Sequence, residues 1–238
     1  DAVSARLSTG DAKAAFRSVA RHSTRLHAYV SIPAAIAVFL LAEPLLRLWV
    51  GRTVQDPDPI SGREVISATV ILVKIMVIGL MSRAISEGWM KLLYGAGHIR
   101  HYAPLVLAGG IANPLIAWLL IEWLPPSWNW TGAAIAFGVV FLFVHLIMLP
   151  VTNAKQLGST WQDILGALCR PAVLALVPTV VYAGVLLWTD PVPWWIVLPS
   201  CLVYAVAYGV LGIFLGLEPA ERAKILVLWH RARTRRVQ

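Results

Sequence analysis

The chain has 238 residues, of which 58% are apolar and 13% are charged. Soluble domains are about 45–50% apolar and about 25% charged, so this sequence has too few polar residues to cover a soluble surface. Its formal net charge of +8 comes mainly from residues between and after apolar stretches, which favours membrane topology over nucleic-acid binding. We expect an all-α, polytopic membrane protein with no nucleic-acid partner.

The first 25 residues are polar and contain no apolar core, so we expect no signal peptide there. Because the sequence starts at Asp1, we also expect the chain to begin partway through a longer protein.

Six apolar stretches follow, each near the roughly 20 residues that a helix needs to cross a hydrocarbon core about 30 Å thick. Four prolines inside these stretches, Pro33, Pro114, Pro178 and Pro199, predict kinks, because neighbouring helices can satisfy the carbonyl groups that a proline leaves free. Turn-forming sequences separate the stretches, so we expect short connections without a further domain. The approximate bounds are Leu26–Leu48, Val65–Tyr94, Tyr102–Leu124, Thr131–Val151, Pro171–Trp188 and Pro191–Leu217.

The distribution of Lys and Arg predicts the orientation. Of the 20 such residues, 14 fall on the side that holds residues 1–25 and the C-terminal end, four lie within spans, and only Arg52 and Arg63 fall on the other side. The positive-inside rule places both termini in the cytoplasm. Tryptophans at the predicted outer ends of spans form an interfacial belt consistent with this orientation. They are Trp49, Trp123, Trp128, Trp130, Trp188, Trp194 and Trp195.

Two segments, Ser159–Arg170 and Ala220–Arg236, mix charged and apolar residues and predict helices that lie along the cytoplasmic leaflet. The two cysteines, Cys169 and Cys201, fall at the cytoplasmic edge and within the bilayer, so we expect free thiols.

Residues 1 to about 155 carry several short motifs in a characteristic order. They are the segment from Thr9-Gly10-Asp11 to Arg25, the helix end Glu43–Gly51, the turn Leu93–Gly97, and Asn113 followed by an apolar run and Gly132-Ala133-Ala134. In this order the chain resembles the C-terminal part, about helices 9 to 14, of polysaccharide and O-antigen flippases of the multidrug/oligosaccharidyl-lipid/polysaccharide exporter superfamily.

The resemblance implies three parts. Residues 1–155 would be part of the flippase core, with a cytoplasmic loop and four spans. Residues 156–217 would be an interfacial segment with two additional spans, and residues 218–238 a basic cytoplasmic tail. The missing N-terminal lobe would complete the central cavity.

The implied function is alternating-access movement of a saccharide on polyprenyl pyrophosphate across the bacterial inner membrane, with membrane lipids as the other partner and without a cofactor. A drug/cation antiporter of the same superfamily is an alternative, although antiporters usually have 12 helices. A membrane-embedded polysaccharide ligase or polymerase is another, although such enzymes carry a long external loop. We see no nucleophile–base arrangement and no metal-ligand spacing, so we expect no enzyme and no metal site.

Charged residues in the second span are the candidate substrate-binding groups, because ionisable side chains at bilayer depth are costly. Arg83, Glu87 and Lys91 recur every four residues and predict one polar stripe, whereas Lys74 lies on the opposite side of a straight helix. Arg83 could bind pyrophosphate through its forked guanidinium, or could form an intrahelical pair with Glu87. Lys74 would snorkel, or would join the stripe through a kink near Gly79.

Three further residues are hinge or coupling candidates. His145 could titrate in an ion-coupling step, or could be a packed neutral histidine with a hydrogen bond. Asn113 and Pro114 could form a hinge in the third span, or a static kink. At the outer headgroups, Glu43 and Arg47 predict an interfacial ion pair.

Overall fold

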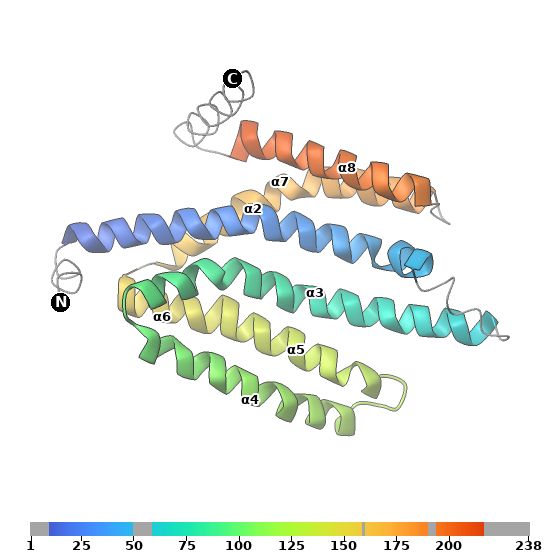
Figure 1. Cartoon of the computed structure of the whole chain (residues 1–238), viewed down its shortest axis with the longest axis horizontal. Coiled ribbons are helices and arrows are strands. Elements are labelled where there is room, and N and C mark those ends of the chain that lie inside the picture. Colours follow the sequence, from blue (N-terminus) through green and yellow to red (C-terminus); the bar gives the residue numbers. More distant parts are fainter. Residues whose placement is uncertain (1–9, 50–58, 159, 190–193, 217–238) are drawn as a thin grey trace, which may run out of the picture.

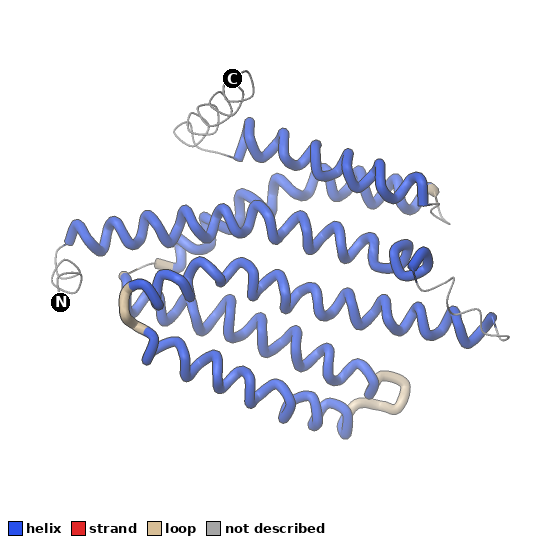
Figure 2. The backbone as a smooth tube through the Cα atoms, viewed as in Figure 1, coloured by secondary structure: helices blue, strands red, loops and turns tan. Residues whose placement is uncertain are grey.

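The computed structural model describes residues 10–49, 59–158, 160–189 and 194–216, and every regular element in these ranges is a helix (Figures 1 and 2). The elements are α2 (Gly10–Trp49), α3 (Pro59–Gly95), α4 (Ile99–Trp123), η1 (Asn129–Thr131), α5 (Gly132–Phe143), η2 (Val144–Met148), α6 (Leu149–Leu157), α7 (Trp161–Trp188), α8 (Trp194–Leu211) and η3 (Gly212–Gly216). Segments η1, α5, η2 and α6 follow one another without a loop, as do α8 and η3.

Six helical segments are long and apolar enough to cross a membrane, which confirms the predicted six-span α-helical architecture. The protein is therefore a multi-span membrane protein. The segments are Ala14–Trp49, Glu64–Gly95, Ile99–Trp123, Asn129–Leu157, Trp161–Trp188 and Trp195–Gly216.

Two helices extend further toward the predicted cytoplasmic side than the apolar stretches suggested. The expected loop up to Arg25 is helical from Gly10, because alanine is frequent in this segment and no proline interrupts it. The expected interfacial segment Ser159–Arg170 is joined to the fifth span in one helix that starts at Trp161. Both helices exceed the length of a bilayer core, so their first turns extend beyond it. The predicted tail helix Ala220–Arg236 lies outside the described residues.

The helices pack in the order α8, α7, α2, α3, α5 and α4 (Figure 1). Helix α2 is central in this arrangement, because it contacts α3 on one side and both α7 and α8 on the other. Helices α3 and α5 run in the same direction, because α4, which separates them in the sequence, runs in the opposite direction (Figure 1). Both cysteines are free, as expected.

Close contact between α3 and α5 depends on two glycines. A Cβ atom at Gly79 would lie 2.9 Å from the Phe137 ring and 3.3 Å from the Gly138 backbone, and one at Gly138 would lie 3.3 Å from the Ile75 carbonyl oxygen. Small residues allow membrane helices to approach closely and gain van der Waals contact. These glycines therefore set the spacing between the two helices that position the candidate site.

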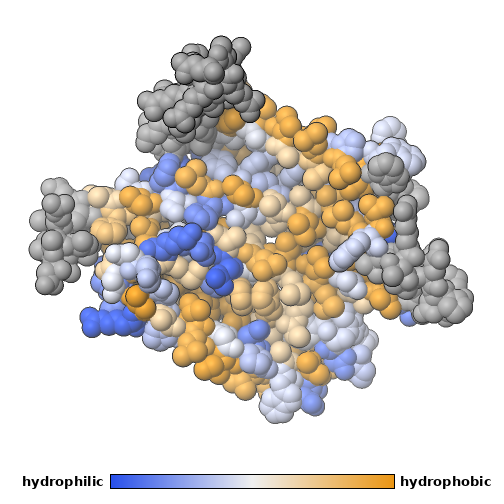
Figure 3. All heavy atoms as spheres, viewed as in Figure 1, coloured by the Kyte–Doolittle hydropathy of each residue, from blue (hydrophilic) through white to orange (hydrophobic). Residues whose placement is uncertain are grey.

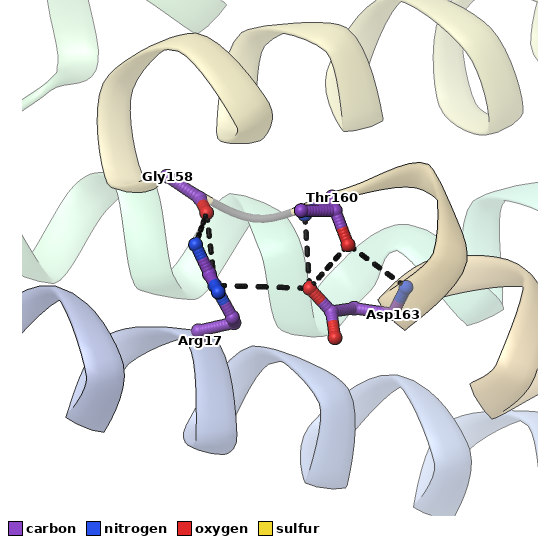
Figure 4. A network of polar contacts seen from close by, with 4 residues as sticks. All are labelled: Arg17, Gly158, Thr160 and Asp163. Carbon is purple, nitrogen blue, oxygen red and sulfur yellow. Dashed lines mark hydrogen bonds and ion pairs between the residues drawn. The ribbon is translucent and has the colours of Figure 1, made fainter.

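A polar clasp joins the N-terminal part of α2 to the turn between α6 and α7 (Figure 4). The Arg17 guanidinium donates to the Gly158 carbonyl oxygen from Nε at 3.0 Å and from Nη2 at 2.7 Å, and Nε lies 3.8 Å from Asp163 Oδ2. Gly158 has a φ of 74°, a left-handed conformation that favours glycine at a helix C-terminus. Thr160 and Asp163 form a capping box that starts α7.

We predict that a cysteine replacing Ser127, in the α4–η1 turn, reacts with an impermeant thiol reagent applied outside cells. Cysteines replacing Arg100 or Lys155 should react only after permeabilisation, because they lie at the predicted cytoplasmic end of the spans. Labelling is measured in a protein with Cys169 and Cys201 replaced by serine. Reaction at Arg100→Cys from outside would reverse the predicted orientation.

We predict that Gly79→Leu destabilises the protein, because the side chain would push α3 away from α5; overpacking of this kind costs about 1–3 kcal/mol. Gly110→Leu is the matched control, since a Cβ atom at Gly110 would meet no other atom within 4 Å. Thermal unfolding in detergent measures both variants. Equal melting temperatures for the two would show that the α3–α5 spacing does not require glycine.

Candidate functional site

Three charged side chains form one polar stripe along α3, as the sequence predicted. The Arg83 Nε–Glu87 Oε2 distance is 3.9 Å, and the Lys91 Nζ–Glu87 Oε1 distance is 3.6 Å. Glu87 is therefore shared between two cations, and the stripe carries a net formal charge of +1.

The stripe lies on a face of α3 that the described helices leave partly open. The side chains of Arg83, Glu87 and Lys91 are 48%, 38% and 71% exposed, whereas Ile85 and Trp89, on the packed faces of the same turns, are buried. Figure 3 shows hydrophilic side chains gathered over α2 and α3 toward the end of the bundle where α2 begins, on a face with many hydrophobic residues.

The depth of the stripe makes its partial exposure significant. The second span covers Glu64–Gly95, so Arg83 is about 5 Å from its middle at roughly 1.5 Å per residue. An arginine at the centre of a membrane helix costs about 2.5–3.5 kcal/mol on insertion scales, and such residues usually face a bundle interior or a water-filled cavity. Water or another polar surface against the open face of α3 would lower this cost.

His145 is buried beside the stripe, at the contact between α3 and η2. Its Nδ1 atom is 2.7 Å from Ser86 Oγ, and its ring centroid is 5.2 Å from that of Phe141. The histidine lies in a π-helical turn, Val144–Met148, that ends two residues before Pro150. A proline ring clashes with the carbonyl four residues earlier in an α-helix, and a wider turn relieves this clash.

Lys74 does not join the stripe. Its Nζ atom lies 5.2 Å from the centroid of the Phe39 ring, so the side chain points toward α2 and makes a cation–π contact. The Glu43–Arg47 pair is present at the end of α2, with a distance of 2.6 Å between Arg47 Nη2 and Glu43 Oε1, which confirms the predicted pair.

Asn113 and Pro114 lie within α4, which continues through both residues. Pro114 is exposed, while Asn113 is half-buried and its Oδ1 atom is buried without a hydrogen-bond partner in the described part of the chain. Helix α4 packs mainly on α5. Their proposed hinge or coupling role stays a prediction, as does that of His145.

The sequence reasoning missed several buried polar residues near the predicted cytoplasmic end. Thr24 accepts a hydrogen bond from the Trp89 indole across the α2–α3 contact, and Arg25 and Asn153 are also buried. Arg25 follows a run of polar residues, which predicts a cytoplasmic loop, but it is buried within α2. The missed signal is helical spacing, since Thr24 falls four residues before Ala28, which is fully buried.

Two histidines lie near the junction of α3 and α4: His98 is in the turn, outside the spans, and His101 is in the first turn of α4. The His98 and His101 rings are 5.5 Å apart in an edge-to-face arrangement. Partial burial lowers the pKa of His98 below its ordinary value, and the nearby His101 and Arg100 lower it further. His98 therefore favours its neutral form at neutral pH.

An apolar groove of about 350 Å³ lies between α7 and α8, with Val181, Val203 and Leu211 among its lining residues. Its walls offer almost no polar group, so it does not suit a sugar head group. In the described ranges, no group of three or more His, Cys, Asp and Glu residues could hold a metal ion.

No family model, no curated protein and no solved structure matches this chain. The fold and the stripe define its class, a multi-span α-helical membrane protein with a charged face near the middle of one span.

We predict that Leu80→Cys reacts with a water-soluble thiol reagent and that Ile78→Cys reacts at least tenfold more slowly. Both native side chains are exposed, at 53% and 41%, but Leu80 lies on the face of Arg83, whereas Ile78 lies about 140° around the helix. The reaction rates in membranes report which face meets water. Equal rates would mean that the stripe does not face an aqueous space.

Proposed function

We propose that this chain is a lobe of a flippase that moves a lipid-linked saccharide across the bacterial inner membrane by alternating access, and that it is a transporter without catalytic chemistry. The observation that carries the proposal is the half-exposed Arg83–Glu87–Lys91 stripe near the middle of α3. A charged face at this depth suits a polar cavity that takes a hydrophilic head group while the lipid tail stays in the bilayer.

In this proposal the cavity is closed by a second lobe, supplied by residues outside this chain. Rocking of the two lobes would expose the cavity first to one side and then to the other. The extensive contacts of α2 with α3 and α7 support a lobe that moves as a unit.

Arg83 is the proposed contact for the pyrophosphate of a polyprenyl-linked sugar. Its guanidinium carries five N–H donors in a fixed fork that matches phosphate oxygens. Glu87 Oε2 lies 3.9 Å from Arg83 Nε, a weak contact that leaves donors available for a ligand. Lys91, nearer the helix end and 71% exposed, would attract the anionic head group as it enters.

We predict that, in the complete protein, Arg83→Lys is partly active and Arg83→Ala is inactive, while both reach the membrane in normal amount. Lysine keeps the charge but loses the fork. Arg47→Ala is the control, because it also removes an arginine paired with a glutamate four residues away, but at the end of α2 and outside the stripe; it should retain most activity. Surface polysaccharide and protein abundance are measured in cells that depend on the variant.

The double change Arg83→Ala with Glu87→Ala separates binding from charge balance. If Arg83 only balances charge, the double variant should regain function, because it returns the stripe to its net formal charge of +1, which the single change lowers to zero. Recovery of transport in the double variant would refute the binding role of Arg83.

A further inference from the structure

The Ser86 hydroxyl group makes two short polar contacts. Its Oγ atom lies 2.9 Å from the Arg83 carbonyl oxygen and 2.7 Å from His145 Nδ1. A hydroxyl group has a single proton to donate. Both contacts are hydrogen bonds only if Ser86 donates to Arg83 and His145 donates from Nδ1–H to Ser86. The geometry therefore selects the Nδ1–H tautomer of the imidazole.

The imidazole is held in a fixed orientation by its surroundings. Phe137, Phe141 and His145 form a column of rings on successive turns, with centroid separations of 4.1 Å and 5.2 Å. The Phe137 end of the column packs against Gly79 of α3. The π-helical turn of Val144–Met148 then presents His145 to Ser86. Each of these contacts limits how far the ring can turn away from α3.

Ser86 lies at the edge of the charged stripe. It is three residues after Arg83 and one residue before Glu87, about 60° and 100° around the helix. Within one turn of Ser86, the Trp89 indole donates to Thr24 of α2. Helix α3 therefore has one polar contact with each of two different neighbours within a single turn. Two such contacts on different sides restrict rotation of α3 about its axis. Apolar packing alone would restrict this rotation less.

We propose that Ser86 and His145 are positioning residues, which hold the rotation of α3 so that the face of Arg83 and Glu87 meets the aqueous cavity. The inference rests on the proposed function, because it assigns the cavity to that face. The positioning role requires the Nδ1–H donor of His145 and the hydroxyl group of Ser86. It does not require His145 to gain or lose a proton.

The test uses the complete protein carrying Leu80→Cys, with the native cysteines replaced by serine. His145→Phe keeps a ring but removes the donor, and Ser86→Ala removes the hydroxyl with a minimal change of volume. His145→Asn is the conservative variant, because its amide nitrogen branches from Cγ as Nδ1 does; Ser86→Thr keeps the hydroxyl. The labelling rate of the cysteine at position 80 and the KM and kcat of transport are measured at equal membrane abundance.

We expect His145→Phe and Ser86→Ala to slow labelling at least fivefold and to raise KM more than they lower kcat. His145→Asn and Ser86→Thr should stay within about twofold of the parent protein. Parent-like labelling in both His145→Phe and Ser86→Ala would overturn the positioning role, as would a loss in His145→Asn equal to that in His145→Phe. Failure of the parent protein itself to label would instead contradict the proposed aqueous cavity, so the two failures are distinguishable.

Discussion

The hydrocarbon core of a membrane offers no water to pair with polar groups, and this constraint organises the whole molecule. Backbone groups are satisfied within long helices. Several hydroxyl groups within the spans donate to the carbonyl oxygen four residues earlier on their own helix, as Ser82 does to Ile78, Thr69 to Val65 and Thr152 to Met148. These side chains need no hydrogen-bond partner from a neighbouring helix, so adjacent helices can pack through glycine and apolar surfaces.

Against this background, the Arg83–Glu87–Lys91 stripe is distinctive because its partial self-pairing does not cover it. Glu87 neutralises at most one of the two cations, and each side chain remains at least 38% exposed. On the other faces of the same turns, Ile85 and Trp89 are buried by packing. A helix that is packed on two sides and charged on a third fits the wall of a cavity better than it fits the perimeter of a bundle in lipid.

Pro150 lies close to the part of the fourth span that contacts α3. Pro150 has no backbone donor and its ring would clash with the carbonyl of Leu146 in a regular α-helix, and the π-helical turn Val144–Met148, which contains Leu146, relieves this clash. His145 lies in this turn and faces Ser86 of α3. Backbone irregularity in a membrane helix is tolerated where it is covered by protein, and here α3 and α4 both contact η2.

The sequence by itself determined the class of the protein, the number of spans and their approximate bounds, because crossing a bilayer requires about 20 apolar residues whatever lies around them. It also determined the stripe, since a spacing of four residues places Arg83, Glu87 and Lys91 on one helix face in any tertiary structure. Only the tertiary structure decided that Arg25 and Thr24 are buried, that Lys74 contacts Phe39 rather than the stripe, and that His145 is bonded to Ser86. These outcomes depend on which helices become neighbours and at what rotation, and that is set by long-range contacts such as Gly79 against Phe137. Local hydropathy and helical spacing describe one helix at a time, so they carry no information about the partner that a given face will meet.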